Sequence, residues 1–240
     1  MGLLNNKGFE MKKLYTTATI VGLLLCNNLY AQDSSDLAVG AKIGTLGFGI
    51  DGTVGMSENL NLRVNLNTGK CKNDDTDKKY SETGELKLFS AGLIADYHPF
   101  SNGFRVSGGV YYSDIDLDST SSKPENNTQI GDKKYDLTSD TTTKFGVNNS
   151  GVAPYLGIGW GNAIAKGSPW GFSLDVGVMY QGDSDVKLSM SGTAKDSKTG
   201  EVINLATNSE FKENLKKEKS SIEDDLNLYP VISLGVSYKF

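Results

Sequence analysis

The sequence predicts an all-β fold, an eight-stranded antiparallel transmembrane β-barrel with long outer loops and one short loop helix. In the last stretch, 228–240, every second residue back from Phe240 is apolar apart from Pro230, and the alternate row is mostly small or polar. Such alternation indicates a strand with one apolar and one polar face. Seven earlier segments share the pattern, and their connections alternate between short and long, which is typical of bacterial outer-membrane barrels.

The composition agrees with a barrel and excludes a helical membrane protein. Hydrophobic residues make up 38% of the 240 residues, and the mean hydropathy is −0.33. Helical spans require far more apolar sequence, whereas half of each barrel strand faces a polar lumen. The chain holds 28 glycines, many inside strand patterns such as 155–161. Small lumen-facing residues let a narrow barrel close around its other side chains.

Residues 1–31 are predicted to be a secretory signal peptide, which leaves 32–240 as the outer-membrane β-barrel domain. Met11-Lys-Lys13 is a basic start, 18–26 is apolar, and Ala31 precedes the expected cleavage point. Residues 1–10 have no core pattern and are consistent with an over-long start. The apolar run is too short to span a bilayer as a helix. Lipidation at Cys26 is disfavoured because Leu25 is not small.

Export would leave one cysteine and an acidic chain. Removal of 1–31 takes away Cys26, so Cys71 has no partner for an internal disulfide. The same cut removes three lysines and one glutamate, and the formal charge goes from −5 to −7. An acidic surface argues against nucleic-acid binding.

Eight segments alternate with enough length to cross a membrane. The clearest is 60–67, and the segment 89–97 has the weakest contrast between its two faces because its second face is less polar. In the second segment Leu46 falls on the same apolar row as Phe48 and Ile50. The expected strands are 37–44, 46–56, 60–67, 89–97, 104–113, 155–161, 170–181 and 228–240.

The connections set the orientation. Those at 57–59, 98–103 and 165–169 are short, and those at 68–83, 114–151 and 183–227 are long. With both chain ends in the periplasm, every short turn falls inside and every long loop outside, as such barrels require. Only the first outer connection, 44–47, is unexpectedly small.

Two long loops carry local structure. A short hairpin is expected around 128–144. In the last loop, Thr207-Asn-Ser-Glu210 resembles a capping box and precedes one apolar helical stripe. This helix either packs on the barrel rim or lies over or plugs the lumen. Its stripe consists of Phe211, Leu215, Ile222 and Leu226.

Aromatic residues gather near the predicted strand ends, as expected for two interfacial girdles. They are Tyr97, Phe104, Tyr112, Trp160, Trp170, Tyr180, Tyr238 and Phe240.

The run of strands and the final Leu234-Gly-Val-Ser-Tyr-Lys-Phe240 resemble the small outer-membrane barrels typified by the OmpA membrane domain, OmpX and OmpW. The resemblance covers about 37–240. It implies a bacterial outer-membrane location in contact with outer-membrane lipid. It also implies that Tyr238 and Phe240 belong to the signal read by the barrel-assembly machinery. It is weak for activity, because the superfamily includes adhesins, narrow channels, structural proteins and a few enzymes.

Six charged residues fall on the lumen-facing rows. They are Lys42, Asp51, Arg63, Asp96, Arg105 and Asp175, three of each sign. An eight-stranded barrel is just wide enough for side chains to fill it, and unpaired buried charges cost several kcal/mol. These charges are therefore expected to pair in a closed interior. The alternative is a narrow gated channel lined by Arg63 and Arg105.

No catalytic, cofactor or metal site is predicted. The one histidine, His98, falls in a periplasmic turn, where a structural or solvated role is expected. The run Asn73-Asp-Asp-Thr-Asp77 offers carboxylates to Ca²⁺, but it lacks the spacing of an EF-hand loop and is expected to be a solvated loop tip.

The predicted function is structural and surface-exposed, and the protein is not expected to be an enzyme. The outer loops are expected to contact the environment or a host, because loops on rigid scaffolds carry function. The extracellular partner is unknown. A narrow porin-like channel for small solutes is the alternative, and a soluble periplasmic lipocalin-like binder is the third interpretation.

Overall fold

The computed structural model describes residues 37–77, 80–182 and 184–240. The predicted signal peptide, with its over-long start, lies outside the described residues.

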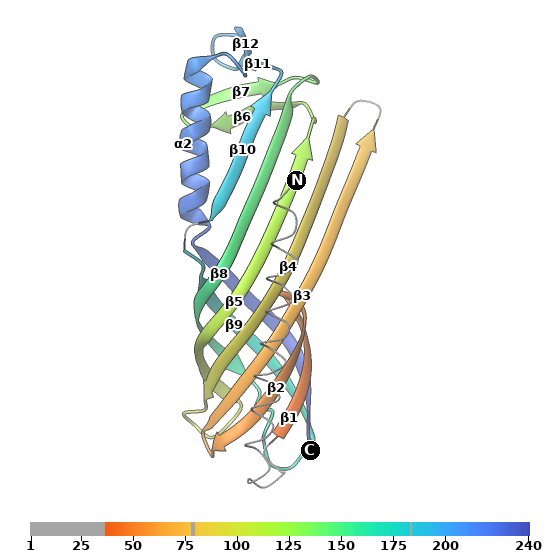
Figure 1. Ribbon diagram of the computed structural model, residues 1–240, viewed down its shortest axis with the longest axis vertical. Coiled ribbons are helices and arrows are strands. Elements are labelled where there is room, and N and C mark those ends of the chain that lie inside the picture. Colours follow the sequence, from red (N-terminus) through yellow and green to blue (C-terminus); the bar gives the residue numbers. More distant parts are fainter. Residues whose placement is uncertain (1–36, 78–79, 183) are drawn as a thin grey trace, which may run out of the picture.

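The strand pairing closes eight strands into a ring, whose arrangement can be followed in Figure 1. Each pairs antiparallel with its neighbours, and β1 closes the ring on β13 with Val39 opposite Tyr238 and Ile43 opposite Leu234. The predicted eight-stranded barrel is confirmed. In order around the ring, the strands are β1 (Leu37–Gly44), β2 (Gly47–Ser57), β3 (Leu60–Asp77), β4 (Tyr80–Tyr97), β5 (Phe104–Ser121), β8 (Thr142–Trp160), β9 (Trp170–Tyr180) and β13 (Leu228–Lys239).

The outward face of the ring is an apolar belt. Phe172 is 78% exposed and Phe48 is 68% exposed. Soluble monomers rarely expose a contiguous apolar surface that runs around the whole molecule, and this one matches the lipid-facing band of a membrane barrel. All eight strands contribute large exposed side chains, for example Val39, Phe48, Leu66, Leu93, Val110, Leu156, Phe172 and Leu234.

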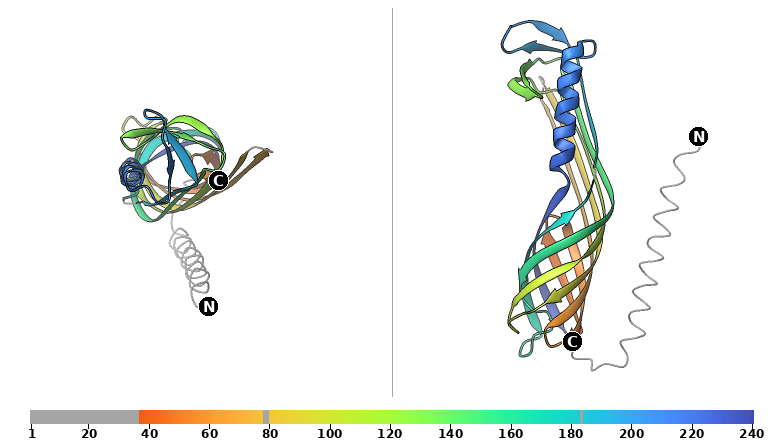
Figure 2. Two further views of the ribbon diagram at one scale, coloured as in Figure 1. Left: turned by 90° about the horizontal axis from the view of Figure 1, so that it is seen from above. Right: turned by 90° about the vertical axis from the view of Figure 1, so that its left-hand side faces the viewer.

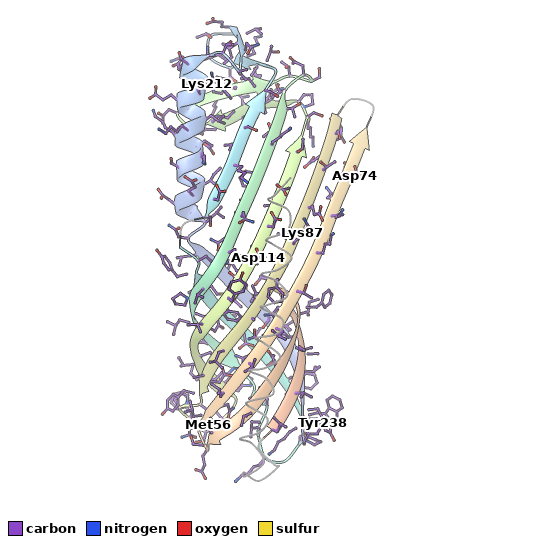
Figure 3. All side chains as sticks on the ribbon, viewed as in Figure 1. Met56, Asp74, Lys87, Asp114, Lys212 and Tyr238 are labelled. Atoms are coloured by element: carbon purple, nitrogen blue, oxygen red, sulfur yellow. The ribbon has the colours of Figure 1, made fainter. Side chains whose placement is uncertain are left out.

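Aromatic side chains mark the end of the belt where the short turns lie. The ring of Tyr238 makes edge-on contacts with Trp170, at 5.1 Å between centroids, and with Phe240, at 5.6 Å. Figure 3 places Tyr238 and Met56 at this end of the barrel. The same end of the barrel contains the turns that link β2 to β3, β4 to β5 and β8 to β9, as the alternation of short and long connections predicts.

Beyond the ring, four strands continue as an outer sheet. β3, β4, β5 and β8 extend past the tip of the β1–β2 hairpin, and β10 (Asp185–Ser191) pairs with the first half of β8. The predicted loop at 68–83 is therefore wrong, because β3 and β4 remain paired as far as Asp77 and Tyr80. The reason is that this hairpin has polar side chains on its outward face and a mixture of small, polar and a few apolar side chains on its other face. The alternation of apolar and polar residues that indicates a strand is therefore weak.

A small second sheet and a helix cover the far end of the outer sheet (Figures 1 and 2). The sheet has the order β12 (Val202–Asn204), β11 (Thr193–Asp196), β7 (Lys133–Leu137) and β6 (Glu125–Ile130), and the helix is α2 (Ser209–Asp225). The predicted hairpin at 128–144 exists, but it spans Glu125–Leu137. We call β6, β7, β11, β12 and α2 the outer module.

The helix begins one residue later than the predicted capping box implies. Asn208 is the N-cap, and its side chain accepts a hydrogen bond from the Phe211 amide at 2.8 Å. α2 lies beside β10 at the edge of the outer sheet, so it does not plug the lumen (Figure 2). Of its predicted stripe, Phe211 is fully buried and Leu215 packs beside it, whereas Ile222 and Leu226 are only half-buried.

The outer module has a core of its own and polar ties between its parts. Tyr135 and Phe211 stack edge-on at 5.3 Å. Asp140 accepts hydrogen bonds from the hydroxyls of Thr138 and Thr193, which join the segment before β8 to β11. The buried apolar residues are Ile130, Tyr135, Leu137, Ala194, Leu205 and Phe211.

Among the described residues, no helix is long and apolar enough to cross a membrane.

Candidate functional site: a closed barrel lumen

All six predicted lumenal charges point into the barrel, and the structure brings them into contact. Lys42 Nζ lies 3.0 Å from Asp51 Oδ1 as a separate pair. The other four form one cluster across the lumen, and none of them is more than 5% exposed. The cluster consists of Arg63, Asp96, Arg105 and Asp175.

Arg63 is the centre of the cluster. Its Nε lies 2.8 Å from Asp96 Oδ2, and its Nη2 donates to Asp96 Oδ1 at 2.9 Å. It also donates to both carboxylate oxygens of Asp175 at 3.3 Å. Such forked pairs fix a guanidinium in both position and direction. Both terminal nitrogens of Arg63 therefore donate to protein carboxylates and are not directed at a passing solute.

Arg105 completes the cluster from β5. Its Nη2 donates to Asp175 Oδ1 at 2.7 Å, and its Nε lies 3.6 Å from Asp96 Oδ1. It also donates to the Gly161 carbonyl. Ser107 Oγ donates to Asp96 at 2.5 Å. Two arginines and two aspartates thus form a neutral, cross-linked layer that spans the lumen.

Above this layer, two tyrosines fill the middle of the barrel. The rings of Tyr111 and Tyr155 meet edge-on at 5.3 Å, and Asn65 donates to the Tyr111 hydroxyl at 2.9 Å. Glycines on the neighbouring strands make room for the rings. A Cβ at Gly92 would lie 2.6 Å from the Tyr111 ring, and one at Gly177 would lie 2.6 Å from the Tyr155 ring.

Apolar side chains close the lumen towards its outer mouth. The prediction that Leu46 faces lipid with Phe48 is wrong, because Leu46 is 6% exposed and belongs to the interior cluster. It lies in the two-residue turn of the β1–β2 hairpin, where the alternation of the strand ends and the chain folds over the lumen. The complete apolar layer is Leu46, Ile94, Tyr111, Ala153, Tyr155, Met179 and Val231.

The empty space within the lumen is small. A cavity of about 30 Å³ lies against the charge cluster, lined by Asp51, Arg63, Asp96, His98 and Arg105 among others. A second cavity, of about 10 Å³, lies beside Lys42 and Leu46. A cavity needs roughly 10–15 Å³ to hold one water molecule. The first therefore has room for about two waters, and neither has room for an organic solute.

His98 lies between β4 and β5, at the end of the lumen where the short turns are, and is 1% exposed. Its Nδ1 is 3.1 Å from the Asn102 carbonyl, and its Nε2 is 3.2 Å from the Asn61 amide nitrogen. Asn61 in turn donates to Asn162 at 3.0 Å. Of the two predicted roles for this residue, the structural one matches its burial and the solvated one does not.

The predicted assembly signal and the acidic run both lie at the surface. Tyr238 and Phe240 are exposed at the C-terminal end of β13, on the side of the short turns. Their role in assembly stays a prediction. Asn73, Asp74 and Asp75 are exposed near the end of β3, and the described residues contain no group of three or more potential metal ligands.

The residues that block the outer half of the lumen were not singled out from the sequence. A usable signal was present, since Tyr111 and Tyr155 are large aromatic residues on rows that, apart from Arg105, consist mostly of glycine and small residues. A bulky ring on such a row faces inward, where only glycines opposite leave space for it.

Solved structures share this fold. The structure of CarO2 from Acinetobacter baumannii has a TM-score of 0.69 and 21% identity, covering 85% of this chain and 98% of the other. That of CarO from the same organism has a TM-score of 0.66, 22% identity and the same coverage. No protein-family model matches the chain. A search of curated proteins found no match either.

The fold is that of an eight-stranded outer-membrane β-barrel, the class to which these neighbours belong. With its apolar belt, the chain has the architecture of an integral outer-membrane protein. The shared fold does not confirm the narrower likeness to OmpA, OmpX and OmpW.

Proposed function

We propose that this protein is a closed barrel that anchors the outer module at the bacterial surface and does not conduct solutes. The observation that carries the proposal is that two successive layers of side chains block the lumen. The charge cluster of Arg63, Asp96, Arg105 and Asp175 forms one layer, and the tyrosine-containing apolar layer forms the next. An open channel requires a continuous water-filled path, and the cavity against the charge cluster has room for about two waters.

The outer module supports a role in surface contact. It has a buried core, and paired strands connect it to the barrel. A folded platform presents its side chains in fixed positions, which favours binding because little ordering entropy is lost. We infer that the module contacts molecules outside the cell.

Conductance measurement tests the closed lumen. The refolded mature protein, shown to be folded by heat-modifiable gel migration, is placed in planar bilayers beside an open porin treated in the same way. We expect no discrete current steps from this protein while the porin conducts. Reproducible steps that change in size when Arg63 and Arg105 are replaced by Ala would instead establish the narrow channel.

Labelling of Cys71 tests the orientation. This cysteine is exposed on β3, and among the described residues it has no disulfide partner. A membrane-impermeant maleimide should therefore label it on intact cells. The control is a Cys71→Ser, Lys166→Cys variant, because Lys166 is exposed in the turn at the other end of the barrel. The control should react only after the outer membrane is opened, and the reverse result would invert the orientation.

A further inference from the structure

The outer sheet has one edge that no strand pairs with among the residues that the structure describes. At the opposite edge, α2 lies beside β10. β2 pairs with β3 only as far as Phe48 and Thr68, because the β1–β2 hairpin turns back at 45–46. β3 continues beside β4 to Asp77 (Figure 1). The unexpectedly small connection at 44–47 therefore leaves the upper part of β3 uncovered on one side.

The backbone of Lys70 and Lys72 points to this uncovered side. In an antiparallel sheet, alternate residues of a strand bond to its two neighbours. The carbonyl of Ser81 accepts a bond at 2.8 Å from the amide of the residue that follows β5, so Ser81 and every second residue of β4 after it bond to β5. Leu86 belongs to the other set and bonds to β3, where its partner is Cys71. The residues on either side of Cys71 therefore direct their N–H and C=O groups away from β4.

The inward face of the outer sheet has an apolar row that ends at this edge. In the strand register, Cys71 lies opposite Leu86, and further apolar residues continue the row on β5, β8 and β10. Cys71 is exposed, so the end of the row is open. An apolar side chain on an added strand would lie beside Cys71 and extend the row. The continuing residues are Leu117, Val147 and Val186.

The outward face carries more carboxylates than lysines, so as a whole it does not attract anions. The side chains next to an added strand are nevertheless those of Lys70 and Lys72, which are 57% and 63% exposed. Like charges directly opposite each other destabilise a strand pair, so acidic residues are favoured over basic ones at these two positions. The charged residues in these outward rows are Lys70, Lys72, Lys87, Asp74, Glu85, Asp114, Asp116 and Asp118.

We propose that this edge of β3 takes up an extended segment of another polypeptide as an additional strand. The backbone groups of Lys70 and Lys72 bond to the segment, as in strand addition to other open sheet edges. The segment has an apolar residue beside Cys71, flanked by acidic residues beside the two lysines. Lysines on an edge deter strands of like charge, and here an acidic strand is the one that fits.

The partner is a different polypeptide and not a second copy of this chain. A second copy does not extend the sheet by translation, because the edge that would meet β3 is that of β10, beside which α2 lies. The location of the partner outside the cell rests on the orientation proposed above. The edge itself does not depend on whether the lumen is closed.

Binding of short labelled peptides to the refolded mature protein in detergent, measured by fluorescence anisotropy, tests the proposal. In the acidic probe valine alternates with glutamate, and in the basic probe valine alternates with lysine. The acidic probe should bind about fivefold more tightly, because the basic probe places like charges opposite Lys70 and Lys72.

Two methylated forms of the acidic probe show whether the backbone pairs. One has N-methyl groups on the glutamate amides and the other on the valine amides. Alternate amides of a strand point to opposite edges, so one form should lose binding and the other should keep it. Loss with the glutamate form indicates antiparallel addition, because residues opposite Lys70 and Lys72 then exchange both bonds with them.

A matched pair of variants shows whether the site is the edge of β3. K72P removes the N–H on the uncovered side and leaves the ladder with β4 complete, since proline is tolerated at such edge positions. K72Q removes the same charge and keeps the N–H. K72P should bind the acidic probe at least about fivefold more weakly than K72Q, because it lacks one hydrogen bond to the added strand.

Several results would overturn the proposal, each by itself. They are no binding of the acidic probe by the folded wild type, equal binding of the basic and acidic probes, the same outcome with both methylated probes, equal affinities of K72P and K72Q, and wild-type dimers that K72P abolishes. The last would assign the edge to a second copy. Heat-modifiable migration verifies that both variants fold.

Failure of this proposal can be told from failure of the proposed function. If Cys71 is labelled from outside and the bilayers stay silent while K72P and K72Q bind the probe equally, only the strand addition is wrong. If Cys71 is protected on intact cells, the location of the partner is wrong even where the probes bind in detergent. If the bilayers conduct while the probes bind as expected, the closed lumen is wrong and the strand addition stands.

Discussion

Replacing Asp175 by Asn should destabilise the barrel more than any exposed ion pair does. Asp175 is 3% exposed and receives hydrogen bonds from both Arg63 and Arg105. Asparagine preserves the volume, removes the negative charge and turns an NH₂ group towards guanidinium donors. The cluster is then left with two buried arginines and one carboxylate.

The expected loss follows from what Asp175 contacts. Breaking a buried ion pair by removing one partner costs about 3–5 kcal/mol, because the other charge stays buried without compensation. Asp96 still holds Arg63 by two contacts, and the adjacent cavity of about 30 Å³ can admit water to Arg105. Both effects favour the lower end of the range, so we expect a loss of about 3 kcal/mol.

Reversible urea unfolding in lipid vesicles, followed by tryptophan fluorescence, measures this loss. The matched control is Asp132→Asn, whose partner Lys217 lies 2.7 Å away but whose side chains are 74% and 52% exposed. Such an exposed pair contributes about 0–1 kcal/mol. If the two variants lose the same free energy of unfolding, the charge cluster is not a structural layer and the reasoning fails.

Two further predictions test other parts of the molecule. Gly177→Ala should cost about 1–3 kcal/mol by overpacking the Tyr155 ring, whereas Gly52→Ala, with nothing within 4 Å of its Cβ, should be nearly neutral; equal unfolding midpoints would contradict this. Between β7 and β8, hydrogen bonds from the hydroxyls of Thr138 and Thr193 lower the pKa of Asp140 below its ordinary value of 3.8. Its contribution to stability is thus present above that pH and is lost as pH falls below it. Amide exchange in 138–142 should accelerate there in the wild type, and an unchanged acceleration in Asp140→Asn would refute the assignment.

The strand number and the orientation of the faces could be read from the sequence, because a barrel strand separates lipid from lumen with a period of two. Leu60 to Asn67 shows this clearly, since its apolar residues face lipid and Arg63 and Asn65 face inward. The alternation of short and long connections independently predicted a barrel with its short turns at one end and its long loops at the other. The six lumenal charges followed from the same rule.

The hairpin from Thr68 to Thr83 could not be recognised, since it lies above the belt. Water reaches its outward side, and no lipid imposes an apolar row there. Its pairing becomes visible only in the register of β3 with β4. The place of α2 was open for a similar reason, because an amphipathic stripe shows which face is buried without naming the surface that buries it.

The closure of the lumen was decided by the tertiary structure. The sequence placed Arg63, Asp96, Arg105 and Asp175 inside, and their equal numbers predicted pairing. It did not determine that both arginines would meet both aspartates in one layer, since Arg63 and Asp175 lie 112 positions apart and meet through the stagger of strands around the ring. Nor did it place Leu46 over the lumen. Alternation along a strand is a local property of the chain. The filling of a barrel depends instead on which inward-facing side chains of the eight strands lie at the same height along the barrel axis.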